Sequence, residues 1–156
     1  DDVIIVFSGA NGAWQSYDLI VKFFQNQKKH NPNIKLLLLS PYNDFVKFLL
    51  NKYPGSVVNK FVEPNKIKSY LLSCDYGILF REKTITNIVS SPVKFGEYLS
   101  CGLKILISDS VGDFSNLVYK NNLGHVISDF SKKIHLKKIN YKTKEFQQQF
   151  SYQYFK

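Results

Sequence analysis

Short apolar runs alternate along the chain with longer segments in which apolar residues recur every three or four positions. The apolar runs predict six strands, at Val3–Gly9, Ile34–Ser40, Ser56–Val62, Tyr76–Phe80, Lys104–Ser108 and His125–Ser128. The segments between and after them predict helices, at Gln15–His30, Asp44–Tyr53, Asn65–Cys74, Ser91–Gly102, Phe114–Lys120 and Lys144–Tyr154. Because the strands read as continuous apolar runs, they predict a parallel sheet with helices on both faces.

This alternation is typical of a doubly wound, Rossmann-like α/β fold, with a six-stranded parallel sheet. We expect the strand order 3-2-1-4-5-6, in which the sheet reverses between the first and fourth strands. Ligands of this fold bind outside the carboxyl ends of those strands. The loops that meet there are Ser8–Gln15, which contains two glycines, and Arg81–Pro92.

The length and composition fit one domain, residues 1–156, with 44% hydrophobic residues to fill its core. The chain has no methionine and enters its first strand by Val3, so we expect it to be a piece of a longer protein. No apolar run approaches the roughly 20 residues of a membrane span, and no signal-peptide pattern opens the chain. We therefore expect a cytoplasmic location.

The net charge of +9 comes almost wholly from lysines, which are scattered along the chain. Such scatter is typical of solvated surfaces, and we expect no nucleic-acid partner. A cluster in the tail is the exception, and it comprises Lys132, Lys133, Lys137, Lys138, Lys142 and Lys144. The Lys132–Lys144 region could lie against anionic lipid, on the inner face of a membrane, or against another domain.

The cysteines and histidines do not indicate a redox or metal site. Cys74 and Cys101 lie in apolar helical segments, and we expect both to be buried thiols. His30, His125 and His135 are far apart and lack ligand spacing. We expect no metal and no cofactor.

The segment S-P-V-K-F-G-E-Y-L-S-C-G carries the strongest functional signal. Ser91 is a favoured N-cap residue, and Pro92 suits the first helical position. The free N–H groups of the first turn attract an anion, and Lys94 adds a full positive charge beside them. Glu97 lies on nearly the same helix face as Lys94. A cationic helix start followed by a carboxylate suits a phosphate followed by a sugar, which is the outline of a nucleotide.

Other candidate residues follow the first, third and fourth strands. Arg81 is the only arginine in the chain, and its planar fork can grip phosphate oxygens in pairs. Gly9 and Asn11 belong to a loop whose backbone could approach a ligand, and Glu63 could face a base or a ribose. The loop has neither G-x-G-x-x-G nor G-K-[ST], which disfavours a nicotinamide dehydrogenase and an ATPase.

The block S-P-V-K-F-G-E-Y-L-S-C-G-L-K-I-L-I-S, followed by Val111-Gly112, resembles the C-terminal domain of bacterial GT-B glycosyltransferases. The closest likeness is to the group 1 glycosyl transferases, family four, including those of capsule and lipopolysaccharide synthesis. Weaker similarity runs through F-S-G with Trp14-Gln15 and through Ser69–Phe80, and the whole resemblance covers about residues 3 to 155.

The resemblance implies a role for each site residue. Glu97 would be the second glutamate of the E-x7-E motif and would bind the ribose hydroxyls. Residues along the diphosphate would be Ser91, Pro92, Val93 and Lys94, and Glu63 would border the base. The chain departs from the family at Val89, where the first glutamate is expected, and it offers Asn11 and Gln15 in place of a basic pair. Arg81 with Lys94 would then form the phosphate clamp.

The resemblance further implies transfer of a sugar from a UDP- or GDP-sugar to a glycan or lipid-linked acceptor, in surface polysaccharide synthesis. The acceptor site would lie in an N-terminal domain that is absent from this sequence. Two alternatives stay open. One is a non-catalytic nucleotide- or phosphate-binding module, and the other is a basic α/β domain that docks on nucleic acid or a membrane.

Overall fold

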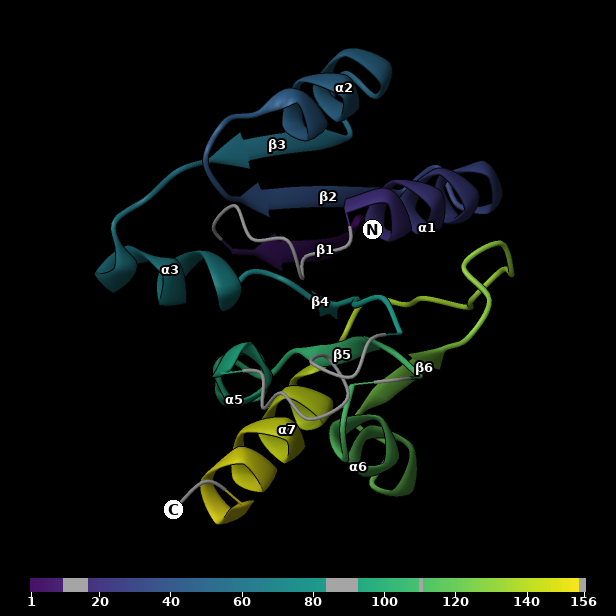
Figure 1. The fold of residues 1–156 in the computed structure, drawn as a ribbon. Helices are drawn as coiled ribbons and strands as arrows, with labels where there is room; N and C mark the ends of the chain where they lie inside the picture. The colour runs from purple at the N-terminus through teal and green to yellow at the C-terminus, as the bar shows by residue number, and fades with distance from the viewer. Residues whose placement is uncertain (10–16, 84–92, 110, 155–156) are drawn as a thin grey trace.

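The computed structural model describes residues 1–9, 17–83, 93–109 and 111–154 and shows one six-stranded parallel sheet (Figure 1). The strand order is β3-β2-β1-β4-β5-β6, as the sequence predicts. The strands are β1 (Val3–Ser8), β2 (Ile34–Leu39), β3 (Val57–Lys60), β4 (Tyr76–Leu79), β5 (Lys104–Ser108) and β6 (Gly124–Ile127).

Helices cover both faces of this sheet, and their bounds are α1 (Tyr17–His30), α2 (Asp44–Lys52), α3 (Pro64–Leu71), α5 (Val93–Ser100), α6 (Phe114–Lys120) and α7 (Tyr141–Tyr154). Buried side chains of α1 and α2 share one core cluster, and those of α3, α5 and α6 share the other. The yellow helix α7 lies beside α5 (Figure 1). The doubly wound architecture expected from the sequence is confirmed.

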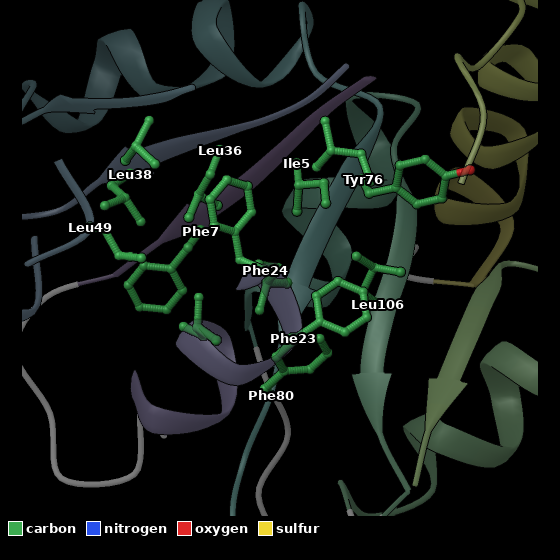
Figure 2. Close-up of a cluster of buried hydrophobic side chains, with 14 of the residues drawn as sticks. Ile5, Phe7, Phe23, Phe24, Leu36, Leu38, Leu49, Tyr76, Phe80 and Leu106 are labelled. Carbon is green, nitrogen blue, oxygen red and sulfur yellow. The ribbon is translucent and has the colours of Figure 1, made fainter. Parts of the chain in front are cut away.

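The two clusters arise because successive residues of a strand point to opposite faces. On β1, Ile5 and Phe7 belong to the cluster under α1 and α2, where Phe23 and Phe24 also lie (Figure 2). Val6 belongs to the opposite cluster. β1 is therefore sandwiched between two layers of helices.

The central strands separate at the point where the sheet reverses. β1 pairs with β2 in register from Val3 to Ser8, but it pairs with β4 only at Ile5 and Val6. In the described part of the chain, β1 and β4 form no further residue pairs beyond Val6 and Gly77. This is the place where the sequence predicts a ligand.

Helix boundaries differ from the prediction by a few residues. α7 begins at Tyr141 rather than Lys144, because Asn140 accepts a hydrogen bond from the Thr143 N–H at 2.9 Å and so caps the helix. α3 begins at Pro64, with Pro64 in the first turn as expected for a residue without an N–H. The expected helix starts at Gln15 and Ser91 lie outside the described residues.

A buried carboxylate fastens the opposite, amino edge of the sheet. Asp75 is fully buried and accepts hydrogen bonds from the backbone N–H groups of Ile4, at 2.8 Å, and Ile139, at 3.0 Å. The ammonium of Lys138 lies 3.0 Å from the same carboxylate. The segment before α7 is thereby tied to the start of β1 and β4.

A second lysine of the tail also has a structural role. The Lys144 ammonium donates to the carbonyls of Leu72 and Cys74, each at 3.0 Å, just beyond the end of α3. A cation is favoured at a helix C-terminus, where carbonyl groups lack partners. Gly102, with a φ of +79°, leaves room for this contact, because a Cβ there would lie 2.8 Å from Lys144 Cβ. The Lys132–Lys144 region is therefore partly a structural device.

Cys74 and Cys101 are both buried and free, as the sequence predicts. Burial raises the pKa of the Cys74 thiol to about 11. Among the described helices, none combines the length and the apolar character that crossing a membrane requires.

Candidate functional site

A tyrosine fixes α5 over the point where β1 and β4 diverge. The N–H of Ser8, beyond the last pairing with β4, donates to the Tyr98 hydroxyl at 3.1 Å. The Tyr98 ring lies against Gly77 of β4, where a Cβ would come within 2.3 Å of the ring. Burial raises the pKa of Tyr98, so its hydroxyl keeps its proton. The second half of α5 is therefore anchored to the carboxyl end of β1.

A pocket of about 280 Å³ lies at this edge of the sheet. Its walls come from the carboxyl ends of β1 and β2, the segment after β3, and the first turns of α3 and α5. The described lining residues are Ser8, Gly9, Leu39, Pro41, Phe61, Val62, Glu63, Pro64, Ile67 and Lys94. The arrowheads of β2 and β3, which mark their carboxyl ends, lie on the same side of the sheet as α3 in Figure 1.

A second pocket of about 420 Å³ continues between α3 and α5. Its described lining residues are Pro64, Ile67, Lys68, Leu71, Lys94, Glu97, Ser100 and Cys101. Pro64, Ile67 and Lys94 line both pockets, so the two form one depression. We call it the α3–α5 groove. The structure thus brings Gly9, Glu63, Lys94 and Glu97 of the predicted site to one groove.

Lys94 and Glu97 form an ion pair in this groove, with 2.6 Å between Nζ and Oε2. Their side chains are 29% and 40% exposed, so both charged groups can be reached from solvent. The prediction that they share one helix face is confirmed. A half-exposed pair of this kind contributes under about 1 kcal/mol to stability, so the two groups can be redirected to a ligand at small cost.

Glu63 occupies the N-cap position of α3, but its side chain makes no capping hydrogen bond. Its carbonyl accepts the Lys66 N–H at 2.9 Å instead. With the residues that the structure describes, the exposed Glu63 carboxylate makes no hydrogen bond or ion pair. The ring of Phe61 also lines the pocket and is 75% exposed. The pocket therefore presents an acceptor and an uncovered aromatic ring.

Arg81 lies after β4, outside the described walls of the groove. Its N–H donates to Ser108 Oγ at 2.7 Å, and the Ser108 carbonyl accepts from Ser115 Oγ at 2.8 Å. These bonds tie together the segments that follow β4 and β5. Partial burial lowers the pKa of the Arg81 guanidinium. Its role in a phosphate clamp with Lys94 stays a prediction.

Three predicted site residues lie outside the described part of the chain: Asn11, Ser91 and Pro92. Gln15 and Val89, at which the chain departs from the family, lie outside it as well. The remaining member of the predicted diphosphate segment, Val93, opens the described part of α5 and is 77% exposed. In the described part of the chain, no group of three or more His, Cys, Asp or Glu side chains could hold a metal ion.

Sequence reasoning missed three residues that shape the site. Tyr98 and Gly77 lie in apolar stretches that read as ordinary core, and only the fold shows that they meet. Phe61 carries no motif of its own, although its place just before the Pro64 helix start was a usable signal. A strand residue next to a helix start belongs to the carboxyl edge of the sheet, where ligands of this fold bind.

No protein-family model matches the sequence, and no curated protein matches it either. Solved structures do match. The catalytic domain of cholesterol-alpha-glucosyltransferase from Helicobacter pylori is 14% identical with a TM-score of 0.67, over 99% of both chains. The C-terminal domain of a glycosyl transferase group 1 family protein from Francisella tularensis is 13% identical with a TM-score of 0.61, over 80% of this chain and 67% of that one.

Larger proteins match over part of their length. An E. coli structure, described as trehalose-6-phosphate bound with UDP-2-fluoro glucose, is 8% identical with a TM-score of 0.60. The match covers 97% of this chain but only 41% of that one. The chain therefore has the fold of the C-terminal domains of GT-B glycosyltransferases, as the sequence predicts.

Proposed function

We propose that the chain is the donor-binding domain of a glycosyltransferase and that the α3–α5 groove binds the nucleoside diphosphate part of a nucleotide sugar. The observation that carries this proposal is the meeting of Glu63, Lys94 and Glu97 in one groove where the sheet reverses. The shared fold supports it, because the matching structures are glycosyltransferases.

The groove offers a partner for each part of such a ligand. The Glu97 carboxylate can accept hydrogen bonds from the two neighbouring hydroxyls of a ribose. Lys94 lines both pockets and can place its ammonium on the diphosphate. The first pocket combines apolar walls with few polar groups, the composition typical of a small-molecule site, and can hold the base.

The same arrangement suits the reaction. When the sugar leaves, negative charge grows on the oxygens of the departing diphosphate. Lys94 lies in the first turn of the described part of α5, where the helix dipole also favours negative charge. Groups fixed in this way stabilise the transition state without having to reorganise. In this proposal the protein's own cations, with Arg81 as a further candidate, offset the charge, and no metal or cofactor takes part.

We further propose that the donor is a UDP- or GDP-sugar and the acceptor a glycan or lipid-linked sugar in surface polysaccharide synthesis. The acceptor would be bound by a separate N-terminal domain, as the resemblance implies. The 156-residue chain should then bind donor nucleotide without transferring sugar. Exposed lysines of the tail region, Lys132, Lys133, Lys137 and Lys142, would contact anionic lipid. Sedimentation with phosphatidylserine vesicles tests this contact, and equal binding to neutral vesicles would exclude it.

Thermal unfolding with added UDP or GDP tests the groove. At about 100 times the dissociation constant, a bound ligand adds roughly 2.7 kcal/mol of stability, which is several degrees for a chain of this size. Lys94→Ala and Glu97→Ala should each reduce this shift. Lys142→Ala and Glu145→Ala are matched controls, because both residues are exposed on α7 with the same spacing. Absence of any shift, or an equal loss in the control variants, would contradict the proposal.

A further inference from the structure

We propose that the first pocket of the α3–α5 groove selects guanine, with Glu63 as the residue that reads the base and Phe61 as the ring on which the base rests. The donor would then be a GDP-sugar. This inference rests on the proposed function, since it assigns the base to the pocket beside Lys94.

The position of Glu63 leaves its carboxylate available to a ligand. It lines the pocket from the N-cap position of α3, yet its side chain does not cap the helix, because the backbone carbonyl takes the Lys66 N–H. An ionised carboxylate is a hydrogen-bond acceptor only. Lys94, the other charged side chain among the described lining residues, already pairs with Glu97.

A carboxylate acceptor distinguishes the bases by their edges. Guanine presents two adjacent donors, N1–H and the N2 amine, which match the two oxygens of a carboxylate. Uracil presents a single N3–H between two carbonyl oxygens, and both of these repel a carboxylate. Adenine and cytosine each place a ring acceptor beside their amine. A two-bond contact with the correct base discriminates by about 1–3 kcal/mol, which is roughly tenfold to a hundredfold in affinity.

The apolar walls of the pocket suit a flat, two-ring base. Phe61 lines the pocket while three quarters of its surface is exposed, and no ring contact in the described part of the chain covers it. Pro41 and Pro64 add rigid apolar surface to the same pocket. A base that rests on an exposed aromatic ring gains affinity, whichever base it is, because every base has a π face. Phe61 therefore supplies affinity, and Glu63 supplies selectivity.

The test compares the affinities of GDP, IDP and UDP for the 156-residue chain by titration calorimetry. IDP is a matched probe because its base lacks only the N2 amine of guanine. We expect GDP to bind roughly tenfold to a hundredfold more tightly than UDP, with IDP weaker than GDP. Glu63→Gln should abolish most of the difference between GDP and IDP. It should raise the affinity for UDP, because the charge that repels the uracil carbonyls is gone. Glu145→Gln, on exposed α7, is the matched control.

The outcomes separate the inference from the function on which it rests. If UDP binds as tightly as GDP, or if Glu63→Gln weakens all three nucleotides equally, the guanine assignment is overturned and the proposed function stands. If none of the three binds, both are overturned. Phe61→Ala should weaken all three nucleotides by the same factor, whereas Phe48→Ala, at an exposed ring of α2, should weaken none. Equal behaviour of these two variants would remove Phe61 from the site.

Discussion

Two pairs of a lysine and a carboxylate lie at opposite edges of the same sheet, and they differ in almost every physical respect. Asp75 at the amino edge is fully buried and takes two backbone N–H groups besides Lys138. Glu97 at the carboxyl edge is 40% exposed and forms an ion pair with Lys94 at 2.6 Å. The Lys94–Glu97 pair is the shorter of the two ion pairs, yet it contributes less to stability, because water screens its exposed charges.

The two carboxylates differ in which groups their removal would leave without a partner. Removal of Asp75 leaves two backbone N–H groups without an acceptor, whereas removal of Glu97 leaves one ammonium that can turn to water. Stability is thus concentrated at the amino edge, and the charges of the carboxyl edge remain available for a ligand. Each prediction below tests one side of this contrast.

The largest expected effect is that of Asp75→Ala on stability. The substitution leaves the N–H groups of Ile4 and Ile139 without an acceptor. It should cost about 3 kcal/mol, since each unsatisfied group costs about 1–3 kcal/mol. The melting temperature should fall by roughly 10 °C for a chain of this size. Lys138→Ala should cost much less, because Asp75 keeps its backbone donors. Urea denaturation measures both variants, and equal losses would refute the structural role of Asp75.

The next effect concerns the anchor of α5. Gly77→Ala places a Cβ within 2.3 Å of the Tyr98 ring and should destabilise by about 1–3 kcal/mol. Tyr98→Phe keeps the ring, removes the acceptor for the Ser8 N–H, and should cost about 1 kcal/mol. Both variants should also weaken nucleotide binding, which calorimetry measures. A destabilised variant with unchanged affinity would separate the anchor from the site.

Alkaline pH should weaken the fold through its buried thiol. The pKa of Cys74 is raised from 9.0 to about 11 by burial, so the native chain holds this proton to a higher pH than the unfolded chain. The stabilisation is complete below pH 9.0 and is lost as the pH rises toward about 11. Cys74→Ala should flatten the dependence of the unfolding free energy on pH over this interval. An unchanged slope would show that other groups cause the decline.

The smallest expected effect on stability is that of the groove pair. Lys94→Ala and Glu97→Ala should each change the free energy of unfolding by less than about 0.5 kcal/mol. Their effect on nucleotide affinity should be far larger. Denaturation and calorimetry on the same samples make this comparison. A loss of stability as large as that of Asp75→Ala would mean that the exposed pair is structural after all.

The fold could be predicted from the sequence because its apolar runs and helical periods are strong and alternate regularly. The strand order and the two-faced core both follow that prediction. The helix edges were less predictable, because they depend on local caps. Asn140, for example, starts α7 before the apolar periodicity of that helix begins.

The site residues were predictable only where a local sequence pattern distinguishes them. Lys94 and Glu97 stand out because helix spacing alone puts them on one face. Arg81 stood out as the only arginine of the chain. Composition does not show where a side chain lies in the fold, and Arg81 does not line the described groove. The meeting of Tyr98, Gly77 and Ser8 depends on contacts between residues more than 20 positions apart, which no local pattern contains.

Amide chemical-shift mapping with added GDP tests the central claim most directly, since it reports where a nucleotide touches the chain. We expect the largest perturbations in two stretches, Phe61–Ile67 and Lys94–Ser100, and none in residues 131–140 at the amino edge. Perturbations confined to residues 131–140, or none in the α3–α5 groove at saturating GDP, would contradict the account.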